Sequence, residues 1–123
     1  MTAEVQAILA ALSAIRMPAQ PEEYEIHEAV ARALDAAGIA YVHEFKLAPG
    51  RRIDFACGNI GIEVKKSRPA ASQLKQQLAR YLENTNLEAM IVVMQKPCTL
   101  PAAICAKPVY VVGLNRLWGV ALR

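Results

Sequence analysis

The sequence predicts an α/β domain with a mixed β-sheet flanked by helices, and three observations indicate it. Apolar residues recur at helical spacing in some segments, whereas others alternate apolar with polar residues or run continuously apolar. Three consecutive strand segments are separated only by turn signals, which predicts an antiparallel meander. A helical segment then precedes a continuously apolar strand, which predicts a right-handed crossover to a parallel strand. The length of 123 residues suits one domain.

Two helices are predicted before the first strand. Apolar side chains recur at helical spacing over residues 3–16, and the proline-containing segment 17–21 then ends that helix. Glutamates after this break suit the first turn of a second helix, and Gly38 suits its C-terminal end. We therefore divide the chain into residues 1–20, an N-terminal helix and linker that packs on the domain or on a partner, and residues 21–123, the main domain.

Three strands are expected to form the meander. Residues 39–47 and 51–56 flank a Pro-Gly turn signal, and residues 60–66 follow the two-residue loop Gly58-Asn59. The later elements are expected to be a helix, a buried strand, a short helical turn, a strand and an ambiguous tail, at residues 70–83, 89–95, 99–105, 109–114 and 116–123.

Two acids stand out within a basic stretch of the chain. Residues 45–80 hold eight of the 14 Lys and Arg residues but only two of the 11 acids, Asp54 and Glu63. A two-residue loop places these carboxylates directly opposite each other across the hairpin, with Lys65 on the same face. The core-facing side is then expected to hold Ile53, Phe55, Ile62 and Val64. Facing carboxylates repel, so the arrangement indicates either a hard divalent cation such as Mg²⁺ or a solvated polar face with a Glu–Lys pair.

The composition excludes several classes of protein. No apolar run reaches the roughly 18 residues that span a bilayer, so no membrane partner is expected. The three cysteines lack paired CxxC spacing, and we expect them to be reduced and mostly buried, in a cytoplasmic protein. The sequence also lacks a Gly-rich phosphate loop and a nucleophile elbow, which leaves a redox or small-molecule enzyme without support.

The two acids and the nearby lysine match a family signature. Asp54, eight intervening residues and then Glu63-Val64-Lys65 resemble the Asp…(Asp/Glu)-x-Lys motif of the PD-(D/E)XK nuclease superfamily. Ile53 stands where the family name has Pro, at a position that the family keeps loosely. The resemblance implies a restriction-endonuclease-like core, in which a three-strand antiparallel meander and a parallel strand are flanked by helices.

Other parts of the chain extend the resemblance. Gln77 and Tyr81 in the later helix resemble the Gln-x-x-x-Tyr motif of RecB-type members. Residues 37–41 are similar to a segment of small Holliday-junction-resolvase-like and phage-type members. The expected order of helix, meander, helix and strand also agrees, so the resemblance covers residues 22–95.

The resemblance implies a Mg²⁺-dependent nuclease that hydrolyses phosphodiester bonds of DNA endonucleolytically, with Mn²⁺ able to substitute. Asp54 and Glu63 would hold the metal, and Lys65 would assist a water or stabilise charge on the phosphate. Gln77 and Tyr81 would lean over the same face of the sheet. The alternative is a non-catalytic nucleic-acid-binding or assembly subunit that keeps the nuclease fold.

The resemblance also implies an acid from the helix before the meander, for which four residues compete: Glu22, Glu23, Glu25 and Glu28. Glu23 is preferred as a catalytic residue and metal ligand, because helical geometry places it on the inward-facing stripe. Glu25 and Glu28 are expected to face solvent. His27 would line the edge of the site or be an ordinary helix-face histidine, and His43 is expected to have no chemical role.

Basic residues surround the predicted site and suit contacts with a phosphate backbone, although a generic basic surface is the simpler interpretation. The candidates are Arg51, Arg52, Lys66, Arg68, Lys75 and Arg80, with Lys46 nearby. Aromatic residues make up only 6% of the chain, so a base-stacking platform and sequence-specific readout are not expected. The expected partner is DNA, and the first helix and the tail around Trp118 are candidate surfaces for a homodimer or a larger complex.

Overall fold

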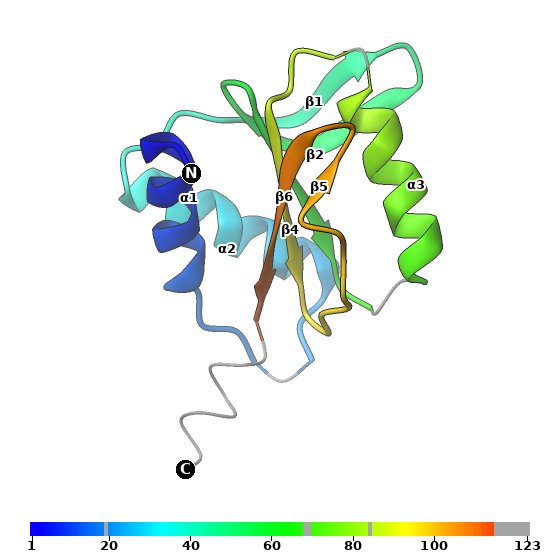
Figure 1. Cartoon of the computed structure of the whole chain (residues 1–123). Coiled ribbons are helices and arrows are strands. Elements are labelled where there is room, and N and C mark those ends of the chain that lie inside the picture. The colour runs from blue at the N-terminus through cyan, green and yellow to red at the C-terminus, as the bar shows by residue number, and fades with distance from the viewer. Residues whose placement is uncertain (19, 68–69, 84, 115–123) are drawn as a thin grey trace.

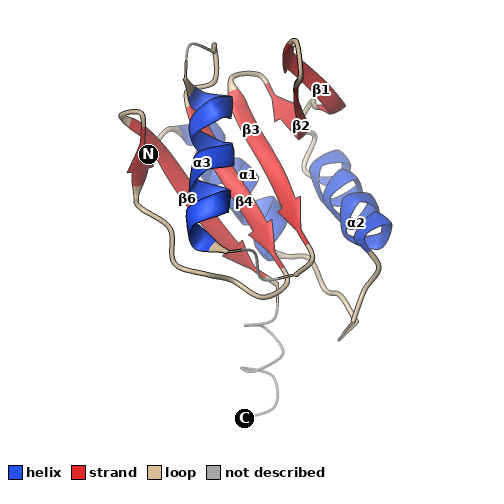
Figure 2. Ribbon diagram, turned by 90° about the vertical axis from the view of Figure 1, so that its right-hand side faces the viewer, coloured by secondary structure: helices blue, strands red, loops and turns tan. Residues whose placement is uncertain are grey.

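Within the residues that the computed structural model describes, six strands form one open mixed sheet, with helices on both of its faces (Figures 1 and 2). The structure describes residues 1–18, 20–67, 70–83 and 85–114. The helices are α1 (Ala3–Ser13), α2 (Glu23–Ala36) and α3 (Ala71–Leu82). The strands are β1 (Val42–Ala48), β2 (Arg51–Cys57), β3 (Ile60–Lys65), β4 (Ala89–Met94), β5 (Ala103–Ile104) and β6 (Lys107–Gly113). Neighbouring strands follow the order β1-β2-β3-β4-β6-β5.

The sheet combines an antiparallel meander with parallel strands. β1 pairs with β2 and β2 with β3 in antiparallel fashion, whereas β3 with β4 and β4 with β6 are parallel. α3 connects β3 to β4 on one face of the sheet, while α1 and α2 lie on the other face (Figure 1). The mixed α/β sheet expected from the sequence is confirmed, including the meander and the parallel strand.

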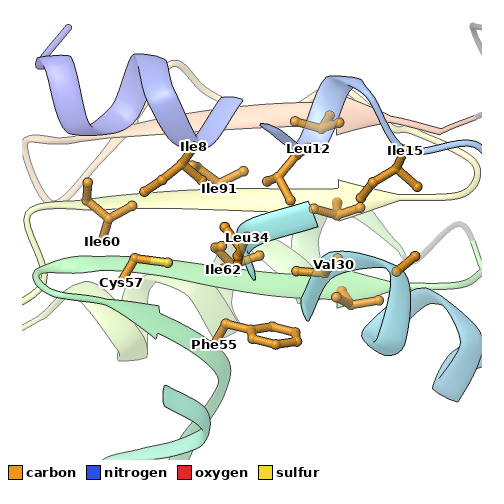
Figure 3. Close-up of a cluster of buried hydrophobic side chains, with 14 of the residues drawn as sticks. Ile8, Leu12, Ile15, Val30, Leu34, Phe55, Cys57, Ile60, Ile62 and Ile91 are labelled. Atoms are coloured by element: carbon orange, nitrogen blue, oxygen red, sulfur yellow. The ribbon is translucent and has the colours of Figure 1, made fainter. Parts of the chain in front are cut away.

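Each face of the sheet carries its own hydrophobic cluster. Between the sheet and the pair α1 and α2, the buried side chains include Ile8, Leu12, Leu34, Phe55 and Ile62 (Figure 3). Beneath α3 they include Leu74, Leu78, Met90 and Val92. Burying each such side chain stabilises the fold by about 1.5–3 kcal/mol. Every residue of β4 is buried because this strand runs between the two clusters, which explains its continuous apolar run.

α1 packs on the core of the domain itself, one of the two alternatives that the sequence leaves open. Val5, Ile8 and Leu12 are buried in the same cluster as the apolar face of α2. The helix begins after Thr2, whose Oγ1 accepts a hydrogen bond from the backbone N–H of Val5 at 3.2 Å. Residues 3–13 therefore contribute to the core of the main domain rather than to a separate unit.

The helical turn expected at residues 99–105 is wrong. Ala103–Ile104 instead form β5, which pairs antiparallel with the start of β6. Cys105 and Ala106 have φ angles of 53° and 61°, and they reverse the chain between the two strands. Two successive residues in the left-handed region make a tight hairpin turn, which a helix does not accommodate.

Three other expectations have different outcomes. The three cysteines are free, but only Cys57 is buried, whereas Cys98 is half-buried and Cys105 is exposed. Within the described ranges, no helix is long and apolar enough to cross a membrane. The ambiguous tail at 116–123, with Trp118, lies outside the described residues.

The side chains of β2 change faces at Asp54. Regular alternation predicts Ile53 and Phe55 on the same face, and this is wrong. Phe55 lies in the cluster under α1 and α2, whereas Ile53 lies in the cluster under α3. The ladder between β2 and β3 extends from the hairpin loop to the pair Phe55 and Ile62, and it stops before Asp54. The two strands therefore part where the first acid of the motif lies.

β1 has a matching irregularity at Glu44, the residue beside Asp54. Glu44 has a φ of 59°, and the pairing passes over it, because its neighbours His43 and Phe45 both pair with β2. Both strands thus depart from regular pairing at the same level of the sheet, although the register is the same on either side and shifts only between Lys46 and Ala48. This departure sets the positions of the side chains that form the candidate site.

Candidate active site

The two acids of the hairpin contact each other through the backbone. The backbone N–H of Asp54 donates a hydrogen bond to Oε1 of Glu63 at 3.3 Å. In turn, Oδ2 of Asp54 accepts a hydrogen bond from the backbone N–H of Val64 at 2.7 Å. The carboxylates thus replace ladder carbonyls as acceptors where β2 and β3 part. The register expected from the two-residue loop is confirmed as far as Phe55 and Ile62, and it brings the two acids together.

Glu63 is a buried carboxyl group, with 4% of its surface exposed. Burial, followed by the negative charge of Asp54, raises the pKa of Glu63 from 4.5 to about 7, although Lys65 opposes the shift. The carboxyl is therefore divided between its protonated and ionised forms near neutral pH. A cation bound beside it would favour the ionised form.

Lys65 lies on the same side of β3 as Glu63, as its spacing predicts. Its Nζ is 3.4 Å from Oε2 of Glu63, and its side chain is 25% exposed. The ammonium group can therefore contact the buried carboxyl and a solvent-borne ligand at the same time.

α3 contributes Gln77 and Tyr81, which the sequence places over this face. Nε2 of Gln77 donates to the hydroxyl of Tyr81 at 2.9 Å, and that hydroxyl donates to Oε2 of Glu63 at 3.4 Å. Burial, followed by the charge of Glu63, raises the pKa of Tyr81 to about 12, so the hydroxyl keeps its proton at neutral pH. The structure brings this pair together with Glu63, and the pair holds its carboxyl in place.

The glutamates at the start of α2 make no contact with the two acids in the described part of the chain. Glu23 does not face inward as expected but is exposed, and its Cβ points toward the open N-terminal end of the helix. Glu22 donates its backbone N–H to Oε1 of Glu25 at 2.7 Å, and its carboxylate lies 3.6 Å from Nζ of Lys66. Glu28 is exposed, as expected, whereas Glu25, also expected to face solvent, is half-buried.

The α2 residue that reaches the site is His27. Its Nε2 is 3.9 Å from Oδ2 of Asp54, and its side chain is only 13% exposed. Its Nδ1 is 2.9 Å from Nε2 of His43 in β1. The sequence predicts His27 at most at the edge of the site, and it predicts no chemical role for His43. The spacing in the sequence gives one indication of this position, because His27 follows Glu23 by one helical turn and so lies on the same face of α2.

Most of the predicted phosphate-binding bases are exposed, as a contact surface requires. The exposed ones are Lys46, Arg52, Lys75 and Arg80, and the half-buried ones are Arg51 and Lys66. Arg68 lies outside the described residues. Among the lysines and arginines that the structure describes, Lys65 is the one within ion-pair distance of Glu63. Lys66 instead lies 3.6 Å from the carboxylate of Glu22.

Comparison of the chain with family models, with curated proteins and with solved structures finds no match in any of the three.

Proposed function

We propose that the chain is a metal-dependent nuclease that hydrolyses phosphodiester bonds of DNA, with a restriction-endonuclease-like core. One observation carries the proposal: a buried glutamate with a pKa raised to about 7 lies beside Asp54 and Lys65. A fold gains no stability from burying a carboxylate beside a second acid. Carboxyl groups perturbed by burial and a specific charged neighbour occur preferentially at functional sites. The order of α2, the meander, α3 and β4 also agrees with the proposed core.

The donor atoms fit a hard divalent cation. Asp54 and Glu63 offer the carboxylate oxygens that Mg²⁺ prefers, and Mn²⁺ accepts the same ligands. A cation between them would relieve the repulsion that contributes to the raised pKa of Glu63. From α2, His27 lies 3.9 Å from Asp54, whereas Glu23, the acid preferred from the sequence, is exposed.

The chain's own residues have distinct parts in this chemistry. Bound Mg²⁺ would supply Lewis-acid stabilisation of the scissile phosphate and lower the pKa of the attacking water. Lys65, partly exposed beside Glu63, is placed to stabilise negative charge that develops on the phosphate. Tyr81 and Gln77 hold the Glu63 carboxyl in one orientation. The exposed bases Lys46, Arg52, Lys75 and Arg80 are available for contacts with backbone phosphates.

The alternative is a non-catalytic subunit that binds nucleic acid or assembles with other proteins through the same fold. The exposed bases favour binding to a polyanion under either alternative. A binding subunit, however, does not need a buried carboxyl with a perturbed pKa beside a second acid and a lysine. The perturbed carboxyl therefore favours catalysis.

A substrate panel tests the proposal. The purified chain is incubated with linear DNA, branched DNA and RNA in Mg²⁺, Mn²⁺ or EDTA, and the products are resolved on denaturing gels. We expect cleavage of DNA in Mg²⁺ and in Mn²⁺, and none in EDTA. A mobility shift without products under every metal condition would support the non-catalytic alternative instead.

The chain's two aspartates offer matched variants for this assay. Asp54→Asn keeps an oxygen that can accept the hydrogen bond from Val64 but removes the charge, so we expect a loss of cleavage of about 10²-fold or more with the fold retained. Asp35→Asn is the control, because Asp35 accepts a hydrogen bond from Tyr41 at an exposed place elsewhere on the domain. Equal cleavage by the two variants would contradict the proposed role of Asp54.

A further inference from the structure

A shallow hollow between α2 and β1 gathers histidine and glutamate side chains beside the proposed active site. It has a volume of about 420 Å³, and its lining includes Glu23, His27, Glu28, His43 and Glu44. His43 and Glu44 have no part in the proposed cleavage of DNA. The proposed cleavage of DNA therefore does not explain why these side chains gather in the hollow.

Three side chains of the hollow converge on one point. Nδ1 of His27 is 2.9 Å from Nε2 of His43, and Nε2 of His43 is 4.0 Å from Oε2 of Glu44. One ligand atom of each residue lies within 4.8 Å of the other two. Zinc–nitrogen bonds are about 2.05 Å long, so two nitrogens on one ion lie about 2.9 Å apart at right angles and about 3.3 Å apart at a tetrahedral angle. The two nitrogens lie at hydrogen-bonding distance, which equals their separation on an ion that binds them at right angles, and they would move apart by about 0.4 Å on a tetrahedral ion.

Packing on the core holds both imidazoles in place. The ring of His43 stacks on the ring of Phe55, with centroids 4.5 Å apart and planes 19° apart. The ring of His27 lies 5.7 Å from the same phenyl group, which is fully buried. Ligands fixed in this way lose little conformational freedom when an ion binds.

The backbone of β1 brings Glu44 to the two histidines. In a regular strand, the residue after His43 would point to the opposite face of the sheet. Glu44 instead has a φ of 59°, in the left-handed region that costs an L-residue roughly 1–2 kcal/mol. Its carboxylate consequently lies beside His43. Strained backbone of this kind occurs preferentially at ligand sites.

Asp54 supports the cluster from the other side of the His27 ring. Its Oδ2 is 3.9 Å from Nε2 of His27, which is ion-pair distance and longer than a hydrogen bond. Histidines that bind metal ions usually donate their second N–H to a carboxylate, which selects the tautomer and makes the binding nitrogen more basic. With its proton on Nε2, His27 has the lone pair of Nδ1 available for an ion that it would share with His43.

We propose that His27, His43 and Glu44 bind a divalent transition-metal ion of the Zn²⁺ class, at a site separate from the carboxylates of Asp54 and Glu63. Two imidazoles and a carboxylate suit Zn²⁺, Co²⁺ or Ni²⁺, whereas Mg²⁺ prefers oxygen ligands throughout. Water completes the coordination from the solvent side of the hollow. This second site does not require nuclease activity.

Titration of the full chain with Zn²⁺ and Co²⁺, in the absence of nucleic acid, tests the site. Zn²⁺ affinity is measured by competition with a chromophoric chelator, and Co²⁺ binding by its visible absorption. Cys98 and Cys105 are free thiols that are not fully buried, so the near-ultraviolet band of thiolate-bound Co²⁺ is monitored as well. With excess Mg²⁺ present to occupy the carboxylates of Asp54 and Glu63, we expect one further ion per chain and no thiolate band.

Three variants connect the ion to the cluster. His43→Ala is expected to weaken Zn²⁺ and Co²⁺ binding by about tenfold or more, and Glu44→Gln by less. Glu28→Gln, which removes an acid of the same hollow outside the cluster, is expected to leave the affinity unchanged. The side chain of His43 is 45% exposed, and thermal unfolding confirms that each variant folds. Absence of metal binding, a thiolate band, or equal affinity of the wild type and His43→Ala would overturn the proposal.

Discussion

Removing the charge of Glu63 is expected to stabilise the metal-free protein at alkaline pH. Glu63→Gln nearly preserves the shape of the side chain and keeps an oxygen for the backbone N–H of Asp54, while its amide can pair with the hydroxyl of Tyr81. The glutamine does not ionise, so the variant avoids the cost of burying a negative charge beside Asp54.

The magnitude follows from the pKa of Glu63, which is about 7 in the folded protein against an ordinary value of 4.5. Between these values the folded state binds more protons than the unfolded state, so stability falls as the pH rises through this interval and stays lower above it. At about 1.4 kcal/mol for each unit of pKa, the loss is on the order of 3 kcal/mol. We therefore expect Glu63→Gln to exceed the wild type by a similar amount near pH 8 and to match it near pH 4.

Urea unfolding followed by circular dichroism in EDTA, near pH 4, 6 and 8, measures this difference. Glu28→Gln is the matched control, because it replaces an exposed glutamate and should show no pH-dependent difference from the wild type. Added Mg²⁺ should stabilise the wild type near pH 8 more than it stabilises Glu63→Gln. If Glu63→Gln differed from the wild type by the same amount near pH 4 and pH 8, the reasoning from a perturbed buried carboxyl would be refuted.

Three further changes have expected outcomes. Gly61→Ala would place a Cβ 2.5 Å from Sδ of Met90, so we expect the free energy of unfolding to fall by about 1–3 kcal/mol. An unchanged denaturant midpoint would contradict this packing. Tyr81→Phe removes the hydroxyl that donates to Glu63, which should lower the free energy of unfolding by about 1 kcal/mol. It should also lower kcat more than it changes DNA affinity. A change in DNA affinity alone would argue that Tyr81 does not position the Glu63 carboxyl. Zn²⁺ should inhibit Mg²⁺-dependent cleavage by the wild type more than cleavage by His43→Ala. An ion in the hollow would hold the imidazole of His27 and add positive charge beside Asp54, which is proposed to bind Mg²⁺. Equal inhibition of the two proteins would show that Zn²⁺ acts elsewhere.

The meander and its register could be predicted because local chemistry determines them. Gly58 has a φ of 59°, which glycine adopts without steric cost, and a two-residue loop permits one register near the turn. Phe55 accordingly pairs with Ile62. The position of Ile53 could not be predicted in the same way, because alternation of side chains presumes a regular strand, and β2 is irregular at the next residue.

The α2 side of the site could be predicted only in part. Helical angle alone places Glu23 on the inward stripe, but Glu23 is the first residue of α2, and its side chain leans past the end of the helix. His27 lies one turn further along, where its side chain reaches Asp54. The contact with His43 depends on the pairing of β1 with β2, whose register shifts between Lys46 and Ala48, so the Pro-Gly turn that follows does not determine it.

Asp54 is the residue at which the two proposed sites meet. The same carboxylate oxygen accepts a hydrogen bond from Val64 in β3 and lies 3.9 Å from His27 in α2. In a regular β2, Asp54 would face only the α3 side of the sheet, and the α2 layer would lie beyond its reach. The irregularity that Asp54 shares with Glu44 instead places one negative charge between the two layers. A cation bound on either side therefore changes the electrostatic potential on the other, because this carboxylate belongs to one proposed site and lies 3.9 Å from His27 of the other.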